Sequence, residues 1–292
     1  MPQVECVADT KSKIGEGALW DHRTNKLWWV DIPAGLLHAF DPATGSNVTR
    51  EYGEPIGCLA LRQKGGLVLA TKSGFHLFNP ETGKNQALSD PEGHLPDNRF
   101  NDGSTDRNGR FWAGTMKDGG EAEPLGTFYR LDSEFRVQPI LSGFYTTNGL
   151  AFSPDGETLY ASDSHPMVRT LWTFDYDIGT GTPSNRRVFV DTRDLPGRPD
   201  GGTVDTDGCY WMAAIDGGRV IRFTPDGRID REVKLPVERP SKPMFGGPNL
   251  DILFVTSLSV GLSADTDQPL AGGLFAITGL GVQGLPEAAF PG

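Results

Sequence analysis

Short apolar segments recur along the whole chain and are separated by polar turns. Each is rich in aromatic and branched aliphatic residues, as at 27–30, 67–70, 111–114, 159–162, 210–213 and 253–256. The segments alternate in polarity or are apolar throughout, which is typical of strands whose sheets pack on both faces. Because no stretch keeps the period of an amphipathic helix, the pattern predicts an all-β protein.

Turn sequences fall between neighbouring apolar segments. Examples are DRNG at 106–109, PDG at 154–156 and DTDG at 205–208. Glycine adopts positive φ without strain, while Asp and Asn tolerate it and bond their own backbone, so these sequences indicate tight hairpins. The 38 glycines and 22 prolines are spread along the chain, which fits many hairpins rather than a disordered tail.

The same hairpin unit occurs six times. The units begin near residues 16, 57, 101, 148, 200 and 243, at intervals of 41, 44, 47, 52 and 43 residues. Propeller blades repeat every 40–50 residues or so. A β-sandwich does not repeat one unit six times, so we expect a six-bladed β-propeller formed by a single domain over residues 1–292.

Polar residues open the first strand in four of the six units: Glu16, Asn101, Asn148 and Asp200. In a propeller the innermost strands run along one central channel, so these side chains would converge from around the ring. Confined carboxylates repel each other, and a bound cation relieves that repulsion. Oxygen ligands from Glu16, Asn148 and Asp200 suit one divalent ion: Ca²⁺, Mg²⁺, Mn²⁺ or Zn²⁺. The alternative is that each is an ordinary turn residue.

Charge and composition exclude several classes of function. The net charge of −11 offers no basic surface for nucleic acid, and no apolar run is long enough for a membrane span. With no leader sequence, we expect a cytoplasmic monomer. The three cysteines form no CxxC pair, the five histidines show no metal-ligand spacing, and GxSxG and nucleotide-binding loops are absent.

Several motifs together resemble one known family. In order along the chain, they lie at 15–17 (GEG), 98–103 (NRFNDG), 112–116 (WAGTM), 147–149 (TNG), 184–188 (SNRRV), 199–201 (PDG), 245–247 (FGG) and 272–284. Each is short, but the ordered set is similar to the senescence marker protein, regucalcin and gluconolactonase family of sugar lactone hydrolases. The resemblance spans the whole chain.

The resemblance implies a six-bladed propeller whose divalent metal is held by Glu16, Asn148 and Asp200. It also implies that Arg99 and Asn101 contact the substrate, with a further acidic contact in the loop 117–124. Asp118 and Glu121 both qualify for that contact. The glycine and proline content of the loop suits a mobile lid. The alternative for Arg99 is an ion pair with Asp97 or Asp102, and for the loop a merely solvated connection.

The expected reaction is hydrolysis of a small-molecule sugar lactone, of gluconolactone or pentonolactone type, to the aldonic acid. The metal would polarise the carbonyl and activate water, with Asp200 as ligand and general base. Two alternatives remain open, because fold does not fix function. One is a metal-dependent phosphotriesterase or esterase, which would need a more apolar pocket. The other is a non-catalytic calcium-binding regulator or interaction module, which would need an exposed apolar patch.

Overall fold

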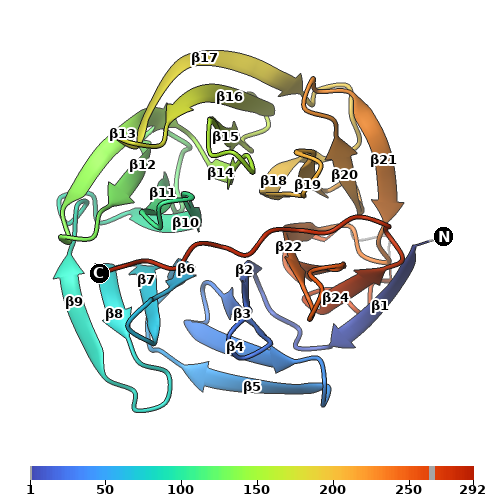
Figure 1. Ribbon diagram of the computed structural model, residues 1–292, viewed down its shortest axis with the longest axis horizontal. Helices are drawn as coiled ribbons and strands as arrows, with labels where there is room; N and C mark the ends of the chain where they lie inside the picture. The colour runs from blue at the N-terminus through green and yellow to red at the C-terminus, as the bar shows by residue number, and fades with distance from the viewer. Residues whose placement is uncertain (1, 263–266) are drawn as a thin grey trace.

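Six four-stranded antiparallel sheets stand around a central axis (Figure 1). The structure is a computed structural model that describes residues 2–262 and 267–292. Those residues form 24 strands and no helix, which confirms the predicted six-bladed β-propeller. In the described part of the chain, therefore, no helix has the length and apolar character that a membrane crossing needs. The cytoplasmic location and the monomeric state stay predictions.

Each blade takes four strands, numbered outward from the channel in chain order. Blades 1 and 2 comprise β2 (Gly15–Asp21), β3 (Lys26–Asp31), β4 (Leu36–Asp41), β5 (Ser46–Glu51), β6 (Ile56–Leu61), β7 (Leu67–Thr71), β8 (Gly74–Phe78) and β9 (Asn85–Ser89). Blades 3 and 4 comprise β10 (Asn98–Thr105), β11 (Phe111–Lys117), β12 (Gly126–Leu131), β13 (Val137–Phe144), β14 (Thr147–Phe152), β15 (Thr158–Asp163), β16 (Thr170–Asp177) and β17 (Thr182–Asp191). Blades 5 and 6 comprise β18 (Arg198–Val204), β19 (Tyr210–Ile215), β20 (Arg219–Phe223), β21 (Ile229–Lys234), β22 (Pro240–Gly246), β23 (Ile252–Ser257), β24 (Leu274–Thr278) and β1 (Gln3–Ala8).

The two ends of the chain close the ring in blade 6. Its outermost strand is β1, which pairs antiparallel with β24 from Gln3 opposite Thr278 to Ala8 opposite Leu274. The family-like motif at 272–284 covers β24, but no sequence pattern predicted β1, because β1 is half-exposed and only partly apolar. This pairing joins the first strand to the last and leaves the ring without an open seam.

Burial decreases from the channel outward within a blade. In blade 2 the three inner strands are fully buried, whereas the outer strand β9 is largely exposed. The second strands carry the bulkiest core residues, and Trp29, Trp112 and Trp211 have no exposed surface. This explains the sequence pattern, because inner strands packed between neighbouring blades need apolar residues on both faces.

Every innermost strand has an irregularity at the same depth. The register shifts fall between Glu16 and Leu19, Ile56 and Cys58, Phe100 and Gly103, Asn148 and Ala151, Pro199 and Gly202, and Pro240 and Pro243. Bulges re-aim side chains and are common beside active sites. Here the six shifts turn side chains at one level towards the channel.

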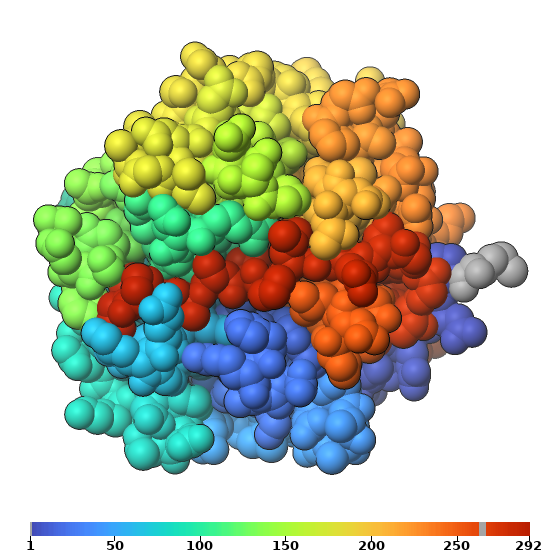
Figure 2. Space-filling model, in the orientation of Figure 1, coloured from blue at the N-terminus to red at the C-terminus, as the bar shows by residue number. Residues whose placement is uncertain are grey.

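A C-terminal strap, residues 279–292, lies across one face of the ring (Figures 1 and 2). It contacts the far ends of the inner strands: the Gly284 region bridges to Asp205, and the amide of Phe290 donates to the Leu61 carbonyl. The Phe290 ring is fully buried. Between this strap and the opposite mouth, a cavity of only about 10 Å³ remains among blades 1, 2, 3 and 6. The channel therefore opens at one end only.

Candidate active site

The residues predicted to converge do so at the mouth of the channel away from the strap. Residues of five of the six blades, all but blade 2, line one cavity of about 220 Å³: Ile14, Glu16, Arg99, Asn101, Met116, Thr146, Asn148, Ser164, Arg198, Asp200, Ile215, Arg239 and Leu258. A water molecule's share of liquid volume is about 30 Å³, so the cavity corresponds to about seven waters, the size of one monosaccharide. Four of its lining residues are apolar, namely Ile14, Met116, Ile215 and Leu258, and the others are polar or charged.

Two of the converging side chains are carboxylates that the protein leaves without a cationic hydrogen-bond partner. Glu16 and Asp200 are each only 5% exposed. Glu16 accepts one hydrogen bond, from the Gly17 amide at 3.0 Å. Among the described residues, none donates a hydrogen bond to Asp200 or forms an ion pair with it. Such groups are costly to bury in the charged form.

The acidities of these carboxyls reflect that cost. Burial raises the pKa of Glu16 well above its usual range, and the nearby Asp200 raises it further. Burial also raises the pKa of Asp200 to about 7, although Arg198 opposes the shift. Both shifts have the direction expected for confined like charges that a cation would neutralise.

The side-chain amide of Asn148 is held in one orientation. Its Nδ2 donates to Ser164 Oγ at 2.6 Å, and its Oδ1 accepts from Asn101 Nδ2 at 3.1 Å. Asn101 Nδ2 also donates to the Thr147 carbonyl at 2.9 Å. An amide oxygen has two lone pairs, so Asn148 Oδ1 keeps one for a cation or a ligand in the cavity.

These donors fit a hard divalent cation. Among the described residues, no three His, Cys, Asp or Glu side chains gather closely enough to hold a metal ion by themselves. The arrangement at the mouth is instead two carboxylates, Glu16 and Asp200, and the amide oxygen of Asn148, all facing one cavity. Three oxygen ligands leave coordination positions for water and substrate.

Arg99 enters the cavity from β10 and is almost fully buried. Its Nη1 donates to Asn101 Oδ1 at 2.8 Å, and its Nε lies 3.1 Å from Asp118 Oδ2. Of the two alternative partners, Asp102 pairs with Lys242, and within the described residues neither Asp97 nor Asp102 forms an ion pair with Arg99. Of the two acidic residues considered in the loop 117–124, Asp118 contacts Arg99, whereas Glu121 is exposed; neither lines the cavity.

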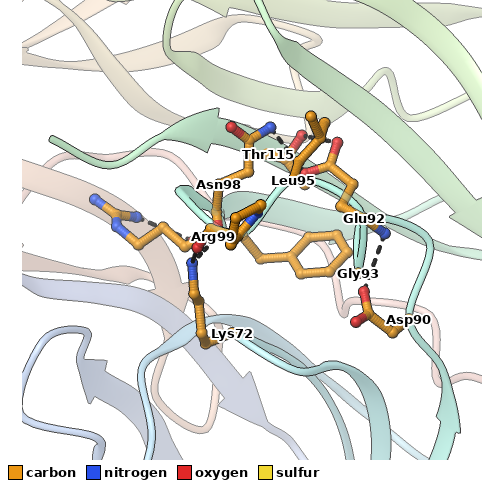
Figure 3. Close-up of a pocket in the computed structure, with 10 residues that line it drawn as sticks. Lys72, Asp90, Glu92, Gly93, Leu95, Asn98, Arg99 and Thr115 are labelled. Carbon is orange, nitrogen blue, oxygen red and sulfur yellow. Dashed lines mark hydrogen bonds between the residues drawn. The ribbon is translucent and has the colours of Figure 1, made fainter. Parts of the chain in front are cut away.

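A second hollow of about 220 Å³, beside the first, explains how β10 is supported (Figure 3). At its centre Glu92 accepts hydrogen bonds from Asn98, Thr115 and Tyr129, at 2.8–3.0 Å. Lys72 donates to the carbonyls of residues 96 and 98. The guanidinium of Arg99 extends away from Glu92 (Figure 3). Glu92 therefore anchors the start of β10, from which Arg99 reaches the cavity.

Two aspartates that the sequence analysis missed fix the loops leading into the site. Asp31 accepts from the amides of residues 13 and 14, just before Glu16. Asp163 likewise accepts from the amides of residues 145 and 146, just before Asn148. Both end the second strand of their blade, in WWVD and YASD. Their shared position at the end of the second strand was the feature of the sequence that could have identified both aspartates.

Lys242 was also missed, since it precedes Pro243, which we took as the start of the sixth unit. Its Nζ lies 2.7 Å from Asp102 Oδ1, and both residues are buried. Burial lowers the pKa of Lys242, but Asp102 outweighs it and the net shift is upward. Asp102 follows Asn101, so this ion pair lies one residue deeper in the channel than the site. In the strand register Lys242 matches Asp102 of blade 3 and Gly201 of blade 5, so no shared residue type marked the position in the sequence.

The chain has close relatives of known name. The sequence profile described as SMP-30/Gluconolactonase/LRE-like region matches residues 14–259. The chain is 40% identical to 6-deoxy-6-sulfogluconolactonase of Pseudomonas putida and 38% identical to regucalcin of Xenopus laevis, in both cases over 99% of each protein. Its structure matches that of a calcium-binding protein, regucalcin of Agrobacterium tumefaciens, with a TM-score of 0.91 and 30% identity, covering 97% of this chain and 96% of that one.

Proposed function

The chain belongs to the SMP-30/gluconolactonase/LRE-like family, and from this premise we propose that it is a metal-dependent sugar lactonase. The substrate is an aldonolactone of gluconolactone or pentonolactone type, and the product is the aldonic acid. The observation that carries the proposal is the pair of buried carboxylates, Glu16 and Asp200, that share a monosaccharide-sized cavity with the oriented amide of Asn148. Relatives named as a sulfogluconolactonase and as regucalcin support it.

Glu16, Asn148 and Asp200 are the residues that would hold the cation. When bound, a divalent cation supplies Lewis acidity towards the lactone carbonyl and acidifies water. Asp200 accepts one proton of the attacking water as a general base. The water oxygen bonds to the carbonyl carbon, the ring C–O bond breaks, and the ring oxygen takes the proton back from Asp200 and leaves as a hydroxyl group.

Arg99 and Asn101 position the sugar. Arg99 is fixed by Asn101 and Asp118, and its Nη2 is bonded to no described residue. A fixed guanidinium with a free edge is suited to a sugar hydroxyl or to the carbonyl oxygen. Asn101 already uses its Oδ1 for Arg99 and its Nδ2 for Asn148, so it acts mainly by holding both side chains in place.

Two other functions predict different behaviour. A phosphotriesterase on this fold would need a more apolar cavity than one containing Glu16, Asp200 and three arginines. A non-catalytic interaction module would need a contiguous apolar surface, whereas the large exposed apolar side chains are scattered over five blades: Val48, Leu125, Phe135, Met167, Val188, Ile229 and Val260. Both observations favour the lactonase.

A proton-release assay in weakly buffered solution tests the proposal. Chelator-stripped protein is assayed with gluconolactone, xylonolactone and an organophosphate triester, with Ca²⁺, Mg²⁺, Mn²⁺ or Zn²⁺ added back singly. We expect lactone hydrolysis that is lost with the metal and restored by at least one ion. Asp226→Ala, an exposed acid of the same blade paired with Arg228, is the control and retains full activity. Triester turnover without lactone turnover, or no turnover with any ion, contradicts the proposal.

A further inference from the structure

Two arginines that line the cavity have no role in the proposed reaction. Arg198 begins β18, two residues before Asp200, and Arg239 immediately precedes β22 in the next blade. Both belong to the lining of the cavity that contains Glu16 and Asp200. They therefore form a positively charged side of the same chamber.

The two arginines share a single carboxylate. Asp216 Oδ2 lies 2.8 Å from Arg198 Nε and 2.6 Å from its Nη2, while Asp216 Oδ1 lies 2.9 Å from Arg239 Nε. The contact with Arg239 is an ion pair without an aligned hydrogen bond. One negative charge opposes two positive charges, so this side of the cavity retains one unit of positive charge.

Backbone carbonyls hold both guanidinium groups in place. Arg198 Nη1 donates to the Ser164 carbonyl at 2.8 Å, and Arg239 Nη1 donates to the Val260 carbonyl at 2.6 Å. The two side chains are only 20% and 15% exposed. Within residues 2–262 and 267–292, Arg239 Nη2 has no partner. Because both side chains are already fixed in the free protein, binding a ligand would cost little further side-chain entropy, and Arg239 Nη2 can donate to that ligand.

The local charge contrasts with that of the whole protein. The net charge of −11 repels anions at long range. At the cavity, Arg99, Arg198 and Arg239 face the four carboxylates of Glu16, Asp118, Asp200 and Asp216, so a bound divalent cation would leave a net charge of +1. Neutral lactones need no such excess. Guanidinium groups bind the oxygen pairs of sulfonates, phosphates and carboxylates with matched geometry.

We propose that Arg198 and Arg239 form an anion subsite, which makes the preferred substrate a sugar lactone that bears a sulfonate, phosphate or carboxylate group. This inference rests on the proposed lactonase function and names its substrate class. The lactone carbonyl lies at Glu16, Asn148 and Asp200, and the anionic group lies against the two arginines on the other side of the cavity.

Comparing substrates on the wild-type enzyme tests the proposal without any variant. Gluconolactone is compared with 6-deoxy-6-sulfogluconolactone, 6-phosphogluconolactone and glucarolactone, so that the three oxyanion types are distinguished. We expect kcat/KM for at least one anionic lactone to exceed that for gluconolactone by about 10- to 100-fold, the scale of one or two charge-assisted hydrogen bonds. The advantage should shrink as salt is raised, because screening weakens charge attraction.

Variants then assign the effect to these residues. Arg239→Gln and, separately, Arg198→Gln should each lower the ratio of kcat/KM for the anionic lactone to kcat/KM for gluconolactone about 10-fold or more. Arg219→Gln is the matched control, because Arg219 in the same blade is equally exposed and ion-paired with Glu232, away from the cavity. It should change neither substrate's rate.

The possible outcomes separate this inference from the proposed function. Hydrolysis of gluconolactone with equal or better kcat/KM than every anionic lactone would keep the lactonase and reject the subsite. Equal losses for neutral and anionic lactones in Arg239→Gln would reject it too, since the arginine would then act on the site as a whole. Absence of all lactone hydrolysis would reject the proposed function itself.

Discussion

The open mouth of the central channel and the level below it are formed by the same irregular strands, but they differ in how their buried carboxylates are neutralised. One residue further towards the closed end, Asp102 and Lys242 form a complete buried ion pair at 2.7 Å, and Asp102 also accepts from the Leu150 amide. At the open end, Glu16 and Asp200 are also buried, but no described residue gives either of them a cationic hydrogen-bond partner. Burial alone therefore does not distinguish structural from functional charge.

The difference is whether the protein itself neutralises the charge. A buried carboxylate with a buried lysine is satisfied and needs nothing from solution. A buried carboxylate without one has a raised pKa, as Asp200 and Glu16 do, and is stabilised by binding a cation. The paired charge lies on the side of the channel that the strap covers, and the unpaired carboxylates face the open cavity.

Removing the carboxylate at the open end should have the largest effect. Asp200→Ala loses a proposed cation ligand and the general base, so we expect kcat for lactone hydrolysis to fall by about 10²- to 10⁴-fold. The stability of the folded protein should not decrease, because the substitution removes a buried charge that no cationic group neutralises. In chelator at pH 8, its unfolding temperature should equal or exceed that of the wild type. Full activity, or a marked loss of stability, would contradict the contrast between the two ends.

Breaking the ion pair at the closed end should have the reverse effect. Lys242→Met leaves Asp102 buried and unpaired, which costs about 3–5 kcal/mol of unfolding free energy. The double variant Lys242→Met/Asp102→Asn should recover at least half of that loss, since the uncompensated charge is gone. Denaturant titrations measure both. A loss below about 1 kcal/mol for the single variant would show that the pair is not a structural element.

The open end should also make stability depend on pH in a cation-sensitive way. The pKa of Asp200 is raised from 3.8 to about 7 in the folded state, so the folded protein holds a proton that the unfolded chain releases. The stability that this proton contributes is present below pH 4 and is lost as pH rises through 7. In chelator, the unfolding temperature should fall between pH 5 and pH 8.

Saturating divalent cation should remove most of that fall, because cation binding favours the charged carboxylates. The gain in unfolding temperature on adding cation should thus be larger at pH 8 than at pH 5. Asp200→Asn serves as the control and should show a much smaller dependence on pH. An equal cation effect at both pH values would indicate binding elsewhere on the acidic surface.

The smallest effect is expected at the rim of the open end. Asp118 pairs with Arg99 but is half-exposed, so Asp118→Asn should raise KM about two- to fivefold, the scale of a partly exposed ion pair. Glu121→Gln is the matched comparison in the same loop and should stay within about twofold of the wild type. Steady-state kinetics with the same lactone decide the matter. A larger effect at Glu121 would mean that the loop closes over the substrate differently.

The sequence predicted the ring and much of the site because both follow from repetition. Six hairpin units located the innermost strands, and the residues that open them, among them Glu16, Asn148 and Asp200, line one cavity. The features that the sequence did not predict are contacts between residues that lie far apart along the chain. The β1–β24 closure joins residues more than 260 positions apart. Arg198, Arg239 and Lys242 each look like ordinary basic residues until the ring brings their partners beside them.

Anomalous diffraction from crystals soaked in Mn²⁺ tests the central claim most directly. The account predicts one anomalous peak inside the cavity, about 2.0–2.6 Å from oxygens of Glu16, Asn148 and Asp200, which is the usual range for oxygen ligands of divalent cations. The peak should vanish in Asp200→Ala crystals. A fully active protein whose Mn²⁺ peaks lie only outside the cavity would contradict the claim.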